Sequence, residues 1–230
     1  MYQKETSNSN HKRKINLVVF DFDGTLADTR NNIVTTLQMT IKEMALPSRS
    51  DDECASTIGL PLVYCFKKLF QELTDEQTKL CAETYKKIFN QNLESIKPQA
   101  FPQVKETIKT LKDKGATITI ASSRNHISLV ELTHYLGIDI YISLMLGADD
   151  VVNAKPDAEP VTKTLETMHK KAEETLVVGD MAVDITMGKS AGTKTCGVTW
   201  GNGKEEELRE AGADFILSTM EELTRIVDQL

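Results

Sequence analysis

The sequence predicts an α/β protein: a doubly wound parallel sheet, like a Rossmann fold, with an inserted all-helical segment. Short, continuously apolar runs recur along the chain, as in parallel strands that are covered on both faces. Amphipathic helical segments alternate with these runs, which indicates right-handed βαβ units. One long stretch, residues 29–97, breaks the alternation because it carries only helix signals.

The composition bounds the class and the partners. The 230 residues suit one large domain or a domain with an insertion, and 40% hydrophobic with 27% charged residues is typical of globular proteins. Acidic residues outnumber basic ones by 34 to 27, and this excess argues against nucleic acid or an anionic membrane as the main partner. No apolar run approaches the ~20 residues of a membrane span, and the N-terminus lacks a signal-type stretch. We therefore expect a cytoplasmic protein without nucleic-acid or membrane partners.

The cysteines do not predict a redox or metal site. Their spacing forms no CxxC pair and no Cys/His cluster, and a cytoplasmic location favours reduced thiols. We expect all four to pack in the interior: Cys54, Cys65, Cys81 and Cys196.

The strands can be placed in order. Residues 1–14 are polar and basic, with no apolar face to bury, so we expect a disordered arm. The first strand lies in residues 15–24, which are apolar until acidic residues mark the carboxyl end. Further strands are expected at 116–123, 141–147, 175–180 and 193–200, with 213–217 as a sixth. The helices between them end at Gly115, Gly137 and Gly192, because glycine suits the left-handed residue that closes a helix.

The helical stretch is expected to form a cap. Ser50 with Glu53, and Thr74 with Gln77, fit the capping box that begins a helix. The core would then comprise residues 15–28 and 98–230, and the cap residues 29–97. An insertion that leaves the core directly after the first strand could act as a lid.

The densest chemical signal is Asp21-Phe22-Asp23-Gly24-Thr25 at the end of the first strand. Alternation in a strand places Asp21 and Asp23 on the same side, and Gly24 permits a tight turn after them. Ser122 and Asp180 also follow predicted strands. In an open α/β sheet, ligands bind beyond the carboxyl ends of the strands, so we expect these polar side chains to share one cleft.

These residues resemble the motifs of the haloacid dehalogenase superfamily. DFDGTLAD around Asp21 is similar to the first motif, ASSR around Ser122 to the second, and Lys155 in NAKPDAEP to the third. The run GDMAVD, which contains Asp180 and Asp184, is similar to the GDxxxD fourth motif. The resemblance covers essentially residues 15–230 and implies the same α/β core with a helical cap.

The resemblance also implies a set of roles. Asp21 would be the nucleophile, and Asp23 would act as general acid and base while its backbone carbonyl binds the metal. The metal would be Mg²⁺, which prefers oxygen ligands, held by Asp21, Asp23 and Asp180. The phosphate would be held by Ser122, Ser123 and Lys155. Many members have Thr-Asn where this chain has Ser122-Ser123, which leaves open whether Ser123 makes the contact of that asparagine.

Other residues are expected around this set. The resemblance implies supporting roles for Thr25 and Asp184, although Asp184 could also bind the metal directly or act only as a helix-start acid. Contacts to the rest of the substrate are implied for Arg124, Asn125 and His126, for which helix capping and surface exposure are the alternative.

The sequence therefore predicts an enzyme, a Mg²⁺-dependent phosphatase that acts on a small phosphorylated metabolite through an aspartyl phosphate. GLPL at residues 59–62 and Trp-Gly at 200–201 most resemble the phosphoglycolate phosphatase group. Pyrophosphate hydrolysis, a β-phosphoglucomutase-like transfer and a binding module without catalysis are the alternatives. The sequence indicates neither the particular metabolite nor the oligomeric state.

Overall fold

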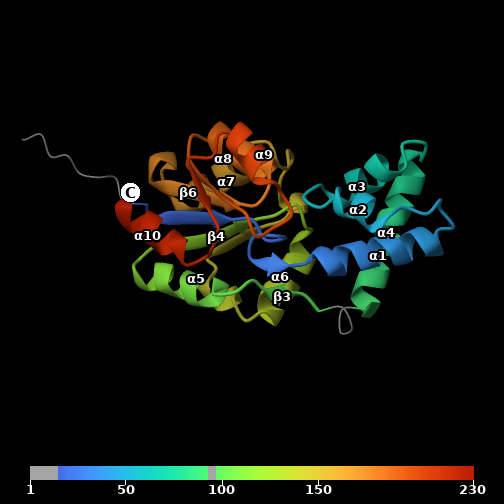
Figure 1. Cartoon of the computed structure of the whole chain (residues 1–230), viewed down its shortest axis with the longest axis horizontal. Helices are drawn as coiled ribbons and strands as arrows, with labels where there is room; N and C mark the ends of the chain where they lie inside the picture. Colours follow the sequence, from blue (N-terminus) through green and yellow to red (C-terminus); the bar gives the residue numbers. More distant parts are fainter. Residues whose placement is uncertain (1–14, 93–96) are drawn as a thin grey trace, which may run out of the picture.

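The computed structural model describes residues 15–92 and 97–230, so the predicted arm and the last residues of the predicted cap before Lys97 lie outside the described residues. Six parallel strands form one sheet in the order β5-β4-β1-β6-β7-β8 (Figure 1). They are β1 (Leu17–Phe20), β4 (Thr117–Ala121), β5 (Leu144–Leu146), β6 (Thr175–Gly179), β7 (Lys194–Val198) and β8 (Phe215–Leu217). Each lies inside a segment predicted to be a strand, and the predicted doubly wound sheet is confirmed.

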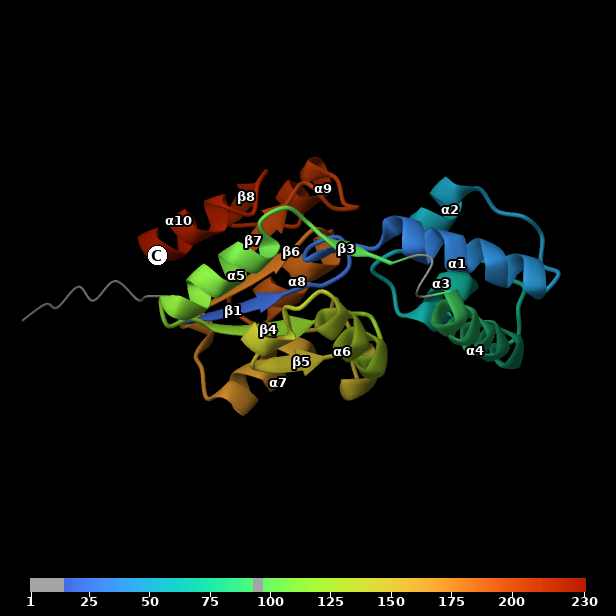
Figure 2. The ribbon, with the colours of Figure 1, turned by 90° about the horizontal axis from the view of Figure 1, so that it is seen from below.

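Helices cover both faces of the sheet, which explains the continuously apolar strands (Figures 1 and 2). Successive residues of β1 point to opposite sides: Val18 and Phe20 pack in one cluster, and Leu17 and Val19 in the other. The first cluster includes side chains of α5 (Val104–Asp113), α6 (His126–Tyr135) and α10 (Glu222–Gln229). The second includes side chains of α7 (Glu159–Met168) and α8 (Ala182–Ser190). Helix α9 (Glu205–Glu210) contacts β7 and β8.

Four helices follow β1 and lie beyond the carboxyl end of the sheet, as Figure 2 shows. We call them the helical insertion: α1 (Arg30–Glu43), α2 (Asp51–Ala55), α3 (Leu62–Leu69) and α4 (Asp75–Asn92). The predicted capping boxes are present, since Ser50 and Glu53 exchange hydrogen bonds and so do Thr74 and Gln77. No helix in the described part of the chain is long and apolar enough to cross a membrane.

A two-stranded ribbon that the sequence did not predict joins the helical insertion to the sheet. Strand β2 (Ala27–Asp28) pairs antiparallel with β3 (Gln99–Ala100). Two residues per strand are too few for a periodic pattern, which is why the signal is absent from the sequence. The ribbon brings the two connections of the insertion side by side.

Candidate active site

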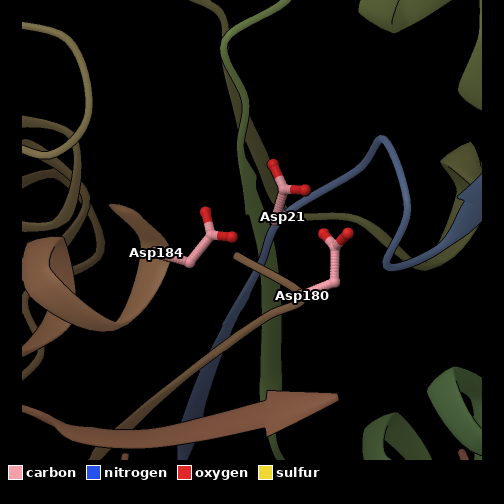
Figure 3. A group of neighbouring side chains, drawn as sticks. All are labelled: Asp21, Asp180 and Asp184. Carbon is pink, nitrogen blue, oxygen red and sulfur yellow. The ribbon is translucent and has the colours of Figure 1, made fainter. Parts of the chain in front are cut away.

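Three buried carboxylates meet at the carboxyl end of the sheet. Asp21 directly follows β1, Asp180 follows the neighbouring β6, and Asp184 lies in the first turn of α8. Each contributes one oxygen, and these oxygens lie within 4.8 Å of one another. Figure 3 shows the three carboxylates around a common space. The parallel topology therefore joins residues that lie about 160 positions apart in the sequence.

Lys155 supplies positive charge to this group. Its ammonium Nζ lies 2.5 Å from Asp21 Oδ1 and 2.7 Å from Asp184 Oδ1, and the side chain is only 3% exposed. The second oxygen of Asp184 accepts the backbone N–H of Met181 at 3.0 Å, so Asp184 also caps the start of α8. Asp184 thus contacts both Lys155 and the start of α8, and its role at the metal stays a prediction.

Burial perturbs the pKa values of these groups. Desolvation raises the pKa of Asp21 well above its ordinary value, with Lys155 opposing the rise and Asp184 adding to it. Desolvation and then Asp184 raise the pKa of Asp180 to about 6, although hydrogen bonds from Asn202 and Thr25 favour its charged form. For Lys155, desolvation works to lower the pKa, but the carboxylates of Asp184 and Asp21 outweigh it and hold the pKa above its usual range. The site therefore places three carboxyl groups beside one charged lysine, so that negative charge at the site is only partly compensated.

Asp180 is held by hydrogen bonds from two loops. Thr25 Oγ1 donates to Asp180 Oδ1 at 3.0 Å, and the supporting role expected of Thr25 stays a prediction. The backbone N–H of Asn202 donates to Asp180 Oδ2 at 2.7 Å. Gly201 lets the loop after β7 approach this closely, because a Cβ at this position would lie only 2.3 Å from Asp180 Oδ2. Trp200 in turn donates its Nε1–H to the Thr25 carbonyl at 3.1 Å and so joins the two loops.

The Asp23 side chain has a different partner. Its Oδ1 lies 2.5 Å from Arg124 Nη2, and its Oδ2 lies 3.2 Å from Arg124 Nε, which makes a bidentate ion pair. The side chains are 13% and 7% exposed, so the pair is nearly buried. Asp23 is absent from the group of three carboxylates, and its expected metal contact through the backbone stays a prediction.

The two serines of the second motif have separate environments. The Ser122 hydroxyl accepts the backbone N–H of Arg124 at 3.1 Å, and the Ser122 N–H donates to Leu146 in the adjacent strand. The Ser123 hydroxyl instead donates to the carbonyl of Gly59 in the helical insertion at 2.7 Å. Ser123 therefore contacts the insertion in this arrangement.

Asn125 and His126 begin α6. The Asn125 side chain accepts the backbone N–H of Ser128 at 3.0 Å, as an N-cap residue does. His126 directs its Nδ1 to Asp150 at 2.6 Å, away from the three carboxylates. Capping, the alternative considered for Asn125, is present in the structure.

The family pattern of haloacid dehalogenase-like hydrolases matches residues 18–198, most of the chain. The chain belongs to this family. This hydrolase is 33% identical to the pyrophosphatase PpaX of Anoxybacillus flavithermus, over 93% of this chain and 97% of the relative. It is 31% identical to a phosphoglycolate phosphatase of Aquifex aeolicus, over 92% of this chain and 96% of the relative. A solved structure from Bacteroides fragilis, of a chain assigned to the haloacid dehalogenase-like hydrolases, superposes with a TM-score of 0.86 at 28% identity, covering 91% of this chain and all of that one.

The residues of this hydrolase fit a divalent metal. Asp21, Asp180 and Asp184 bring three carboxylates together, whereas Lys155 brings one positive charge. Buried charges need nearby compensation, and a cation coordinated by carboxylate oxygens would supply it. Burial raises the pKa values of Asp21 and Asp180, and the neighbouring carboxylate of Asp184 adds to both, so a cation beside these acids would favour their charged forms.

Sequence reasoning missed two features of this site. It did not foresee the Asn202 contact to Asp180, although a Gly-Asn-Gly run directly after a predicted strand is the type of signal that could have indicated it. It also did not foresee that Arg124 would pair with Asp23, since nothing in the local sequence relates the two.

Proposed function

We propose that this hydrolase is a Mg²⁺-dependent phosphatase that cleaves a small phosphomonoester through an aspartyl phosphate on Asp21. The observation that carries the proposal is the buried contact of Asp21 with Lys155 beside Asp180 and Asp184. Asp21 and Lys155 lie beyond the carboxyl ends of the strands, where ligands bind in open α/β sheets, and this position supports the proposal.

Charge explains why Asp21 needs these neighbours. A carboxylate about 3 Å from one phosphate charge meets a repulsion of roughly 5 kcal/mol at an effective dielectric constant near 20. Lys155 offsets part of this repulsion, and bound Mg²⁺ would supply further positive charge to the phosphoryl oxygens. Lys155 contacts Asp21 Oδ1, whereas Oδ2 has a long contact of 3.5 Å from the Thr25 hydroxyl, so we assign Oδ2 as the atom that attacks phosphorus.

The residues of the chain divide two steps between them. Asp21 Oδ2 forms a bond to phosphorus while the bond from phosphorus to the leaving oxygen breaks, and Asp23 donates a proton to that oxygen. A water then attacks the phosphorus of the aspartyl phosphate, Asp23 accepts a proton from the water, and phosphate leaves with Asp21 regenerated. Ser122, with Ser123 if it leaves Gly59, would bind the phosphoryl oxygens.

The substrate we favour is a phosphoglycolate-like phosphomonoester. The support is the likeness to the Aquifex phosphoglycolate phosphatase, but the Anoxybacillus pyrophosphatase is similar to the same degree. Pyrophosphate is therefore the second candidate. A panel of phosphorylated metabolites, assayed with Mg²⁺ for phosphate release and for transfer to a sugar phosphate, separates both from a mutase. A cytoplasmic location stays a prediction.

Replacement of Asp21 by Asn tests the nucleophile. We expect Asp21→Asn to abolish phosphate release, and we expect fluoroberyllate, a mimic of the acyl phosphate, to bind only the parent protein. The control is Asp113→Asn, which removes an exposed acid of α5 and should change neither result. Covalent phosphate found on any other residue by mass spectrometry would refute the assignment.

A further inference from the structure

A cavity of about 290 Å³ lies between the helical insertion and the core, next to the proposed reaction centre. Asp23 and Arg124 line it from the core, and Tyr85 and Lys86 of α4 line it from the insertion. Its size is near the lower end of the range for small-molecule sites. The leaving-group part of a substrate would extend into this cavity, because Asp23 lies in its wall.

Arg124 is built into the wall of this cavity. Its guanidinium donates Nη2–H and Nε–H to the two oxygens of Asp23, and Nη1–H to Ser128 Oγ at 3.1 Å. The guanidinium carbon also lies 5.3 Å from the centre of the Phe89 ring of α4, within cation–π distance. Arg124 therefore contacts the catalytic loop and the helical insertion at once.

The ion pair conflicts with the role proposed for Asp23. Both oxygens of the carboxylate face the guanidinium fork, whereas proton transfer requires one of them to face the leaving oxygen. The fork cannot simply open, because a nearly buried guanidinium without an anionic partner is costly. A second anion at the same place would remove that cost.

We propose that Arg124 exchanges Asp23 for a second anionic group of the substrate, and that this exchange frees Asp23 for proton transfer. The inference rests on the proposed phosphatase function and narrows its substrate class. The preferred substrate carries a carboxylate or a second phosphate a few bonds from the phosphorus that is attacked. A phosphomonoester without a second anionic group cannot replace Asp23 on Arg124, so it reacts more slowly.

The test compares phosphoglycolate with its carboxamide analogue, which differs only in the charge of the distal group. The parent protein should prefer phosphoglycolate in kcat/KM. Arg124→Met, which keeps an apolar side chain beside Phe89, should lower kcat/KM for phosphoglycolate about 10- to 100-fold, the range for a lost hydrogen bond to a charged group. The same variant should change kcat/KM for the carboxamide much less. Arg124→Lys should recover part of the preference.

Controls separate this inference from the proposed function. Lys79→Met removes a charge from α4 at a position that does not line the cavity, and the preference should remain. Hydrolysis of p-nitrophenyl phosphate by the parent protein, lost in Asp21→Asn, shows that the phosphatase function stands. The inference fails if the phosphatase function stands but the parent protein shows no preference for phosphoglycolate. It also fails if Arg124→Met lowers kcat/KM equally for both substrates, because Arg124 then does not bind a second anion. The comparison on the parent protein decides the matter even if Arg124→Met fails to fold.

Discussion

Asp21 and Asp23 are two residues apart, yet their carboxylates have opposite surroundings. Asp21 contacts an ammonium that it shares with Asp184, whereas Asp23 pairs through both oxygens with the guanidinium of Arg124. A guanidinium holds both oxygens of a carboxylate in one plane, while an ammonium contacts one oxygen as a point charge. In the proposed mechanism this difference suits two tasks: Asp21 attacks phosphorus, and Asp23 transfers a proton once Arg124 has another anionic partner.

The proposed acid role of Asp23 can be tested by comparing two classes of ester. We expect Asp23→Asn to slow phosphoenzyme formation from an alkyl phosphate by ~10²- to 10⁴-fold, because an alkoxide leaves poorly without a proton. An activated aryl phosphate, whose leaving group needs little protonation, should lose much less in single-turnover measurements. Asp28→Asn alters an exposed acid of the neighbouring ribbon and serves as the control. Equal losses on both esters would mean that Asp23 only shapes the site.

At this scale the sequence predicted the residues better than their contacts. Asp21 and Asp180 were expected to meet because both follow predicted strands, whereas Lys155 and Asp184 were included through the family resemblance. The structure brings all four into one group. The pairing of Asp23 with Arg124 depends on how the two loops approach each other. That approach is set by tertiary packing, which leaves no local pattern in the chain.

At the level of elements, Gly59 is one point where the helical insertion contacts the core. Its carbonyl accepts the Ser123 hydroxyl, and its backbone has φ +91°, a conformation that favours glycine. A Cβ at this position would lie 2.6 Å from the sulfur of Met181. The left-handed backbone and the nearby Met181 side chain therefore both favour glycine at this position.

Gly59→Ala should weaken this contact. The left-handed backbone alone should cost about 1–2 kcal/mol of unfolding free energy, and displacement of Met181 should add to that cost and raise KM. Gly115→Ala is the matched control, because Gly115 has φ +92° and nothing within 4 Å of the added Cβ. Gly115→Ala should lower the free energy of unfolding by the backbone cost alone, as thermal unfolding can measure, and its kcat and KM should be unchanged. If the two variants behave alike, the Met181 contact has no part in positioning the insertion.

The elements themselves were largely predictable. Strands buried on both faces and helices closed by glycine leave strong patterns, and Gly115, Gly137 and Gly192 have the expected positive φ. The strands are shorter than the predicted segments; β5, for example, begins only at Leu144, after a short 3-10 helix at Asp139–Tyr141. The ribbon β2–β3 escaped prediction, since its pairing joins two segments about 70 residues apart.

For the whole molecule, the excess negative charge at the site should couple metal binding to stability. Mg²⁺ at about 100 times its dissociation constant should add about 3 kcal/mol to the unfolding free energy, which corresponds to a rise of roughly 5–10 °C in Tm. Chelation should reverse the rise and abolish turnover. Asp180→Asn should lose most of the shift, because it removes one of the three carboxylates.

The control for this measurement is Asp214→Asn. Asp214 pairs with Lys189 and Lys194 outside the group of three carboxylates, so this variant should be less stable but should keep the Mg²⁺ shift. Because the whole chain carries a net charge of −7, diffuse cation binding could also stabilise it. A shift retained in full by Asp180→Asn would assign the effect to diffuse binding and remove the proposed metal site.

The ribbon has a consequence for how such an enzyme can change over generations. Asp28 and Gln99 are partners across β2 and β3, so the chain leaves the sheet and rejoins it at almost the same point. The segment between them can therefore become longer or shorter without a change in the spacing of β1 and its neighbouring strands. Mutation can therefore remodel the helical insertion while Asp21, Asp180 and Asp184 keep their positions at the end of the sheet.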